Sequence, residues 1–261
     1  MISVILPTYR NPKYLDLCLK SIIRGQTNQN EIIVVLDGYA EESEEVINKY
    51  KGINVIAFPE NKGMQHALNV GVWNATNEQI FIINDDNVFP PNWDKRLETQ
   101  YSPNEVLTVN QIEPTGPGMF HFPVMDCGQN VDTFDMEKFV DAEQHLCRNT
   151  KTPDGNIFPF LINKKWYMAV GGFDTFYNSP NLCDWDYFAK LELLPHLTRS
   201  RTHFLHLYHF GSVATKKNAE SQQFKEREQF AMQQYYYKWR FPPQNGENNL
   251  KVPRGFYDSG K

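Results

Sequence analysis

The chain has 261 residues, of which 41% are hydrophobic and 22% charged, and its formal net charge is −5. These values are ordinary for a globular domain, and the acidic balance argues against a nucleic-acid partner, which would favour a basic face. No stretch reaches the ~18 apolar residues of a membrane-spanning helix, and the first residues lack a signal-peptide pattern. We therefore expect a soluble, cytoplasmic protein without a transmembrane segment, peripheral to a membrane at most.

The first hundred residues alternate short β-branched runs with segments of helical periodicity. Strands are predicted at 2–6, 32–36, 54–58 and 79–83, of which 2–6, 32–36 and 79–83 are expected to be buried. Apolar residues between 15 and 23 recur every three or four positions, which predicts a helix, and further helices are expected at 41–50 and after Asn61-Lys62-Gly63. Strands that alternate with helices in this way indicate a parallel sheet with right-handed crossovers.

The second half of the chain is less regular. Helices are predicted at about 135–147, 183–194 and 232–239, and strands at 158–162 and 202–210. Because no linker or repeat interrupts the chain, we expect one domain over 1–212, followed by a C-terminal extension, 213–261, packed on it. Within the domain, 1–100 and 101–212 form two halves of different regularity.

Polar residues follow three of the predicted strands, at 9–11, 37–38 and 84–87. In parallel sheets, ligands bind outside the carboxyl ends of the strands, so these segments are candidates for one site. The turn at 84–87 contains Asp85 and Asp86, and carboxylates suit Mg²⁺ or Mn²⁺, which are usually also held by substrate phosphates. The alternative is a turn rich in Asn and Asp that caps the helix expected to start near Pro90.

Six segments taken together resemble glycosyltransferases of family 2. The motif segments are 4–11, 33–38, Asn61-Lys62-Gly63 with the Ala-x-Asn-x-Gly of 67–71, 80–93, Gly171-Gly172-Phe173-Asp174 with Asp184-Trp185-Asp186, and 209–212. The resemblance spans about 3–212, in the family's order, and implies that the half 1–100 binds a nucleotide and the half 101–212 an acceptor. It implies an α/β protein with the GT-A fold, a Rossmann-like, mostly parallel sheet flanked by helices, here with a helical C-terminal extension.

The resemblance also implies an inverting enzyme that moves a sugar from a nucleotide-diphospho-sugar, most simply a UDP-sugar, to a hydroxyl of a glycan or another sugar. Its donor side would be lined by residues at the strand ends and by the loop before the third helix. They are Pro7, Thr8, Tyr9, Arg10, Asp37, Asn61, Lys62, Gly63 and Asp85.

By the same resemblance, Mn²⁺ or Mg²⁺ would be held by Asp86 and His209, with His206 as the rival of His209. Asp184 would be the general base that takes the proton from the acceptor hydroxyl. Phe173, Asp174 and Trp185 would shape the donor-sugar and acceptor site. The chain departs from the family's pattern at Leu36 and Asn84, where Asp is common, and at Cys183, where Glu is usual.

Two other functions are compatible with acidic residues at strand ends. A nucleotidyltransferase would need a glycine-rich, basic loop after the first strand, and the segment 7–12 does not supply one. A catalytically inactive glycan-binding module would have no need of Asp86 and Asp184. Release of free nucleotide from a donor separates these functions from glycosyl transfer.

Overall fold

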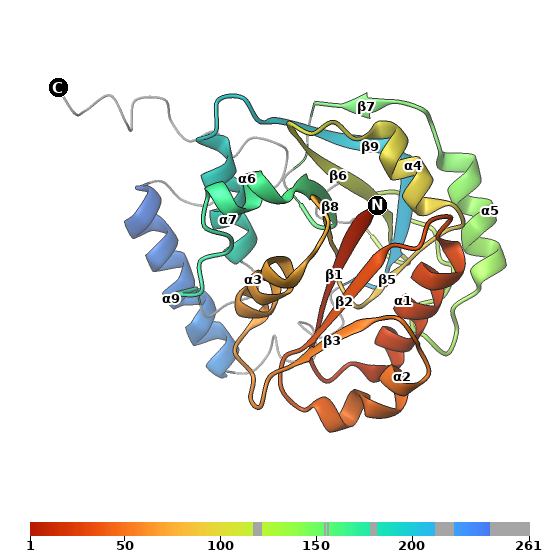
Figure 1. Ribbon diagram of the computed structural model, residues 1–261, viewed down its shortest axis with the longest axis horizontal. Coiled ribbons are helices and arrows are strands. Elements are labelled where there is room, and N and C mark those ends of the chain that lie inside the picture. Colours follow the sequence, from red (N-terminus) through yellow and green to blue (C-terminus); the bar gives the residue numbers. More distant parts are fainter. Residues whose placement is uncertain (117–121, 154, 156, 178–181, 212–221, 241–261) are drawn as a thin grey trace.

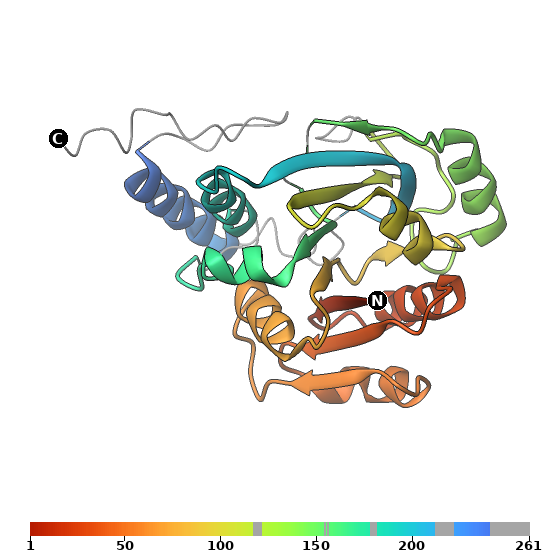
Figure 2. The same cartoon turned by 45° about the horizontal axis from the view of Figure 1, so that its top comes forward.

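A computed structural model describes residues 1–116, 122–153, 155, 157–177, 182–211 and 222–240. Its core is a nine-stranded sheet in the order β3-β2-β1-β4-β8-β6-β9-β5, with β7 paired to β9, and helices cover both faces (Figures 1 and 2). The strands are β1 Ile2–Thr8, β2 Glu31–Leu36, β3 Asn54–Ala57, β4 Gln79–Ile82, β5 Asn87–Val88, β6 Glu105–Ile112, β7 Lys151–Thr152, β8 Phe160–Asn163 and β9 Thr198–His209. The helices are α1 Pro12–Gly25, η1 Ala40–Ser43, α2 Glu44–Asn48, α3 Met64–Asn74, α4 Trp93–Gln100, α5 Met136–Leu146, α6 Lys164–Ala169, α7 Cys183–Glu192 and α9 Gln222–Trp239.

The first four strands form the parallel sheet that the alternating pattern predicts, with β1 between β2 and β4. Every residue of β1 is buried because successive side chains point to opposite, covered faces. Ile5 joins the core beneath α3, whereas Val4 and Leu6 join the core beneath α1. Helix α3 lies so close to β1 that a Cβ on Gly71 would be 2.6 Å from Cγ2 of Ile5.

The second half of the sheet is mixed, which the sequence did not indicate. Strand β8 runs antiparallel to both β4 and β6, while β6 and β9 are parallel with a register shift after Val109. Strand β6 was not predicted, because buried polar residues interrupt its apolar pattern. One of them, Asn110, is satisfied by a side-chain contact of 2.9 Å to His203 on β9.

Helix α9 packs beside α7 (Figures 1 and 2). Tyr235 and Trp239 are buried against the same apolar core as α7, as expected for a docked C-terminal helix. Of the extension 213–261, only 222–240 belongs to the part of the chain that the structure describes, and Ser212 lies outside it as well. None of the helices in the described ranges combines the length and the apolar character that crossing a bilayer requires.

Candidate active site

The carboxyl ends of β1, β2 and β4 meet at one edge of the sheet. The backbone N–H of Asp37 donates to the carbonyl of Thr8 at 3.0 Å, and that of Ile83 donates to Ile5 at 3.2 Å. The acidic turn therefore begins directly beside the residues that follow β1. The structure thus brings together the polar segments that the sequence placed at separate strand ends.

Asp85 is held by the end of β1 and the start of α1. Its two carboxylate oxygens accept hydrogen bonds from Thr8 Oγ1 at 2.6 Å and from Asn11 Nδ2 at 3.1 Å. Burial, and then the neighbouring charge of Asp86, raise the pKa of Asp85 to about 7. Helix α4 has Asn92 as its N-cap residue and no side-chain cap, so the acidic turn does not serve as the helix cap that was the alternative interpretation.

Asp86 is buried next to an imidazole that is itself paired with a second carboxylate. His209 Nε2 lies 3.5 Å from Asp86 Oδ1, and His209 Nδ1 lies 3.0 Å from Glu113 Oε1. Strand pairing sets this arrangement, since His209 on β9 is the register partner of Asn87 on β5. A carboxylate and an imidazole nitrogen at a buried strand end are donor atoms that suit a divalent cation.

His206, the rival of His209, belongs to a different cluster. Its Nδ1 lies 3.9 Å from Glu143 on α5, and its backbone N–H donates to the same carboxylate at 3.1 Å. Burial alone would raise the pKa of Glu143, but hydrogen bonds from His206 and Arg96 lower it to about 2. Glu143, Cys147 and His206 are close enough to hold an ion, yet the Arg96 guanidinium already binds both Glu143 and Cys147. This cluster is therefore a buried ion-pair network.

Asp37 fixes the loop that precedes α3. Its carboxylate accepts hydrogen bonds from the backbone N–H groups of Lys62 and Gly63, at 2.6 and 2.9 Å, and from Asn61 Nδ2 at 2.9 Å. Burial nevertheless raises its pKa above the ordinary range. Gly38 has a φ of +82°, and a Cβ there would lie 2.7 Å from the backbone nitrogen of Asn61. The lack of a side chain at Gly38 therefore allows the loop after β2 to contact the loop that precedes α3.

Tyr9 and Arg10 form a more exposed edge of the same site. Arg10 has a positive φ of 51°, its Nε donates to Glu42 at 2.9 Å, and its guanidinium lies 4.5 Å from the centre of the Tyr39 ring. The rings of Tyr9 and Tyr39 are 5.8 Å apart, edge to face. Pro7, by contrast, is buried within β1.

The segment 171–174 is clamped to α3 by one side chain. Asn69 Nδ2 donates to the carbonyl of Phe173 at 2.8 Å, and its Oδ1 accepts from the Phe173 N–H at 2.8 Å and the Tyr167 hydroxyl at 2.7 Å. Gly172 has a φ of +68°, and a Cβ there would lie 2.4 Å from Asn69 Oδ1. The Phe173 ring is buried and stacks on Tyr187 with centroids 4.2 Å apart, so its side chain belongs to the core.

The acidic residues of α7 divide into two environments. Asp184 is half-buried in the first turn and accepts from the N–H of Trp185 at 2.8 Å; burial raises its pKa to about 7. Asp186 is fully buried and binds α9 through Trp239 Nε1 and Lys238 Nζ, each at 2.8 Å. Trp185 packs partly buried against the core.

Two residues that contact the candidate site residues were not identified by the sequence analysis. Glu113 lies 96 positions before its partner His209, in a segment without periodicity, and nothing in its surroundings marks it. Lys238 contacts Asp174 at 2.8 Å as well as Asp186, but in the sequence it is one cation in an aromatic helical stretch.

The sequence matches the family model described as glycosyl transferase family 2 over residues 3–171. An uncharacterized glycosyltransferase of Haemophilus influenzae is 24% identical over 203 residues, covering 76% of this chain and 64% of that protein. The matched part of the chain spans only 35–64% of the length of the first curated relatives.

Two solved structures share the fold at low sequence identity. Residues 1–349 of Staphylococcus aureus TarS, crystallised with UDP, superpose with a TM-score of 0.55 at 14% identity, covering 92% of this chain and 72% of that chain. The Pyrobaculum calidifontis mannosyltransferase PcManGT, in complex with GDP-Man and Mn²⁺, gives a TM-score of 0.60 at 14% identity, covering 91% and 63%. The expected GT-A fold is confirmed.

Proposed function

The chain belongs to glycosyl transferase family 2, and from that membership we propose that it transfers a sugar from a nucleotide-diphospho-sugar to a hydroxyl of a glycan, with inversion. One observation supports this most directly: Asp86 and His209, both buried, and the half-buried Glu113 form a row beside Asp85. That row lies at the carboxyl ends of parallel strands, where such sheets bind nucleotides. A UDP-sugar and a GDP-sugar are the first donors to test, because the two similar structures were solved with UDP and GDP-Man.

Asp86 and His209 are the residues that would hold a divalent cation. When bound, such a cation neutralises the charge that develops on the departing nucleotide diphosphate. Glu113 would orient His209, because a carboxylate at Nδ1 keeps the proton on that nitrogen and leaves the lone pair of Nε2 facing Asp86. Asp85, fixed by Thr8 and Asn11, would position the ribose end of the donor.

Asp184 is proposed as the general base. A carboxylate with a pKa of about 7 is better matched to proton abstraction at neutral pH than one with an ordinary pKa near 4. It would accept the proton of the acceptor hydroxyl as that oxygen bonds to the anomeric carbon and the bond to the nucleotide diphosphate breaks. Asp37 would contribute by holding the loop 61–63 and would contact the nucleobase with its remaining lone pairs.

The experiment that tests the proposal incubates the protein with UDP-, GDP- and TDP-sugars in the presence of Mn²⁺ or EDTA, and measures nucleotide binding and release. We expect one donor to bind in a Mn²⁺-dependent way, and Asp86→Ala to abolish that dependence. Asp132→Ala, at an exposed carboxylate, is the matched control and should leave donor binding intact.

The same experiment separates the rival functions. If no donor binds with metal present, the transferase proposal is wrong. Pyrophosphate release from a nucleoside triphosphate and a sugar 1-phosphate would instead indicate a nucleotidyltransferase. Binding of glycans without any nucleotide binding would indicate a glycan-binding module.

A further inference from the structure

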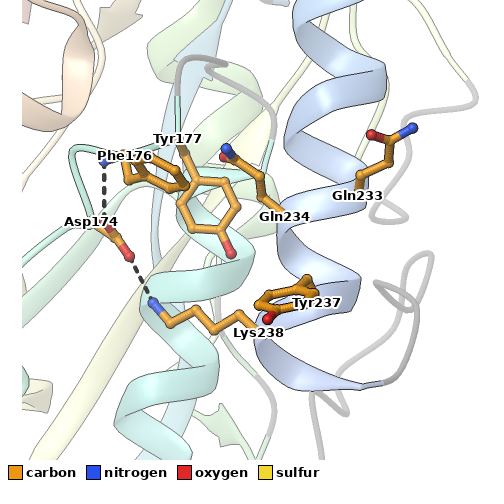
Figure 3. A pocket seen from close by; sticks show the side chains of 7 residues that line it. All are labelled: Asp174, Phe176, Tyr177, Gln233, Gln234, Tyr237 and Lys238. Atoms are coloured by element: carbon orange, nitrogen blue, oxygen red, sulfur yellow. Dashed lines mark hydrogen bonds and ion pairs between the residues drawn. The ribbon is translucent and has the colours of Figure 1, made fainter.

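A pocket lies between the segment that follows Gly172 and the helix α9 (Figure 3), and none of its lining residues belongs to the acidic turn. Its volume is about 580 Å³, within the ~300–1,000 Å³ that ligand sites usually occupy. The lining residues used below are Asp174, Phe176 and Tyr177 on one wall, and Gln234, Tyr237 and Lys238 on the other.

The two walls are joined by a network of charges. Lys238 Nζ lies 2.8 Å from Asp174 Oδ2 and 2.8 Å from Asp186 Oδ1, and Asp174 Oδ1 accepts from the N–H of Phe176 at 3.0 Å. Lys190 approaches Asp186 to 3.8 Å. Two cations therefore offset two carboxylates, so this network provides no excess charge for a charged ligand.

The wall of the pocket that contains Tyr177 is also hydrogen-bonded to helix α3, in the first half of the chain. Gln65 on α3 donates from Nε2 to the carbonyl of Tyr177 at 2.8 Å, and Tyr177 donates its hydroxyl to Asp186 at 3.3 Å. The pocket is therefore fixed by α3, α7 and α9 together before any ligand arrives, which reduces the ordering cost of binding.

The pocket offers stacking surfaces and a side-chain amide. Phe176 and Tyr237 are large aromatic side chains that are 68% and 73% exposed, so their rings are open to a ligand. Gln234 lines the pocket and reaches toward Phe176 and Tyr177 (Figure 3).

We propose that this pocket binds a neutral pyranose ring of the acceptor glycan, an inference that rests on the proposed glycosyl transfer. A pyranose presents C–H faces that pack on aromatic rings and hydroxyls that would bond to the amide of Gln234 and reach Asp174. The balanced charges of Asp174, Asp186, Lys190 and Lys238 favour an uncharged sugar over a phosphorylated or carboxylated one.

The pocket and the proposed base share helix α7 as a support. Asp186, which binds Lys238, and Asp184 both belong to the first turn of α7, but residues two apart on a helix point to different sides. A glycan held at α9 would therefore be anchored on the α9 side of α7 and would extend around the first turn of that helix to reach Asp184.

Saturation-transfer NMR on the full chain tests this, with methyl glycosides of glucose, galactose, mannose and N-acetylglucosamine as probes, alone and as disaccharides. We expect at least one neutral probe to receive saturation on its ring protons, and Tyr237→Ala to weaken its binding about tenfold. Tyr236→Ala is the matched control: Tyr236 is 55% exposed on the same helix but does not line the pocket. Gln234→Ala provides a second, smaller change in the same direction.

The inference is overturned if no neutral probe binds, if glucuronic acid or a sugar phosphate binds at least as well, or if Tyr236→Ala matches Tyr237→Ala. Nucleotide binding with Mn²⁺, measured in parallel, separates this outcome from failure of the proposed function. Nucleotide binding without saccharide binding contradicts only the pocket assignment. Saccharide binding in the absence of any nucleotide binding contradicts the transferase.

Discussion

Protonation of Asp184 should control the rate of transfer near neutral pH. Burial in the first turn of α7 raises the pKa of this carboxyl from 3.8 to about 7, with a smaller contribution from the charge of Glu228 on α9. A base accepts a proton only when it is ionised, so activity is present above this pKa and is lost as pH falls through it. Roughly a tenth of Asp184 is ionised at pH 6 and roughly a hundredth at pH 5. We therefore expect kcat, measured at saturating donor, to fall about tenfold per pH unit below 7 and to level off above about 8.

The assay is initial-rate transfer from pH 5 to pH 9 with saturating Mn²⁺, with the dissociation constant of the donor measured at each pH. Asp184→Asn should keep donor binding and lose transfer, while Asp132→Asn should change neither. A flat profile between pH 5 and pH 7 would refute the assignment of the raised pKa to the base. Asp85, which is proposed to position the donor, also has a pKa raised to about 7. A break in the donor dissociation constant near pH 7 is therefore assigned to Asp85, and only kcat at saturating donor reports on Asp184.

Three further substitutions test the residues that hold the candidate site and its surrounding helices in place. Glu113→Gln should lower Mn²⁺ affinity about 10–100-fold by calorimetry, and unchanged affinity would contradict its orienting role. Asn69→Ala removes three buried hydrogen bonds and should lower the free energy of unfolding in urea by about 2–4 kcal/mol. Its control Asn74→Ala, which removes one exposed bond, should cost less than about 0.5 kcal/mol. Gly71→Ala forces a Cβ against Ile5 and should cost about 1–3 kcal/mol in the same titration; wild-type stability would contradict the close packing.

The sequence predicted those strands whose side chains are buried among apolar residues on both faces of the sheet. Strands β1, β2 and β4 are buried on both faces, so their continuous apolar runs identified them directly. Strand β6 is equally buried, but its residues Asn110 and Gln111 are polar. The partner of Asn110 is a residue of β9 that lies 93 positions later in the chain. The sequence around β6 therefore cannot show that this polar side chain is satisfied inside a buried strand.

The residues of the candidate site also differ in how far the sequence alone could identify them. Asp85, Asp86 and Asp37 follow predicted strands, so topology alone placed them at one edge of the sheet. Glu113 could not be found, because its role depends on a contact with His209 across the sheet. The motif residue Asn69 was recognised by resemblance, but its three hydrogen bonds to Phe173 and Tyr167 became visible only in three dimensions.

The pocket on α9 lies entirely beyond residues 3–171, the part of the chain that matches the family model. On the roles proposed above, most donor contacts fall within the matched stretch, whereas His209 and the pocket fall after it. We expect substitutions of Gln234 or Tyr237 to alter which glycan is bound while the strand ends stay unchanged. Exchange of the pocket-lining side chains of α9 between related enzymes is accordingly the change that we expect to redirect the choice of glycan.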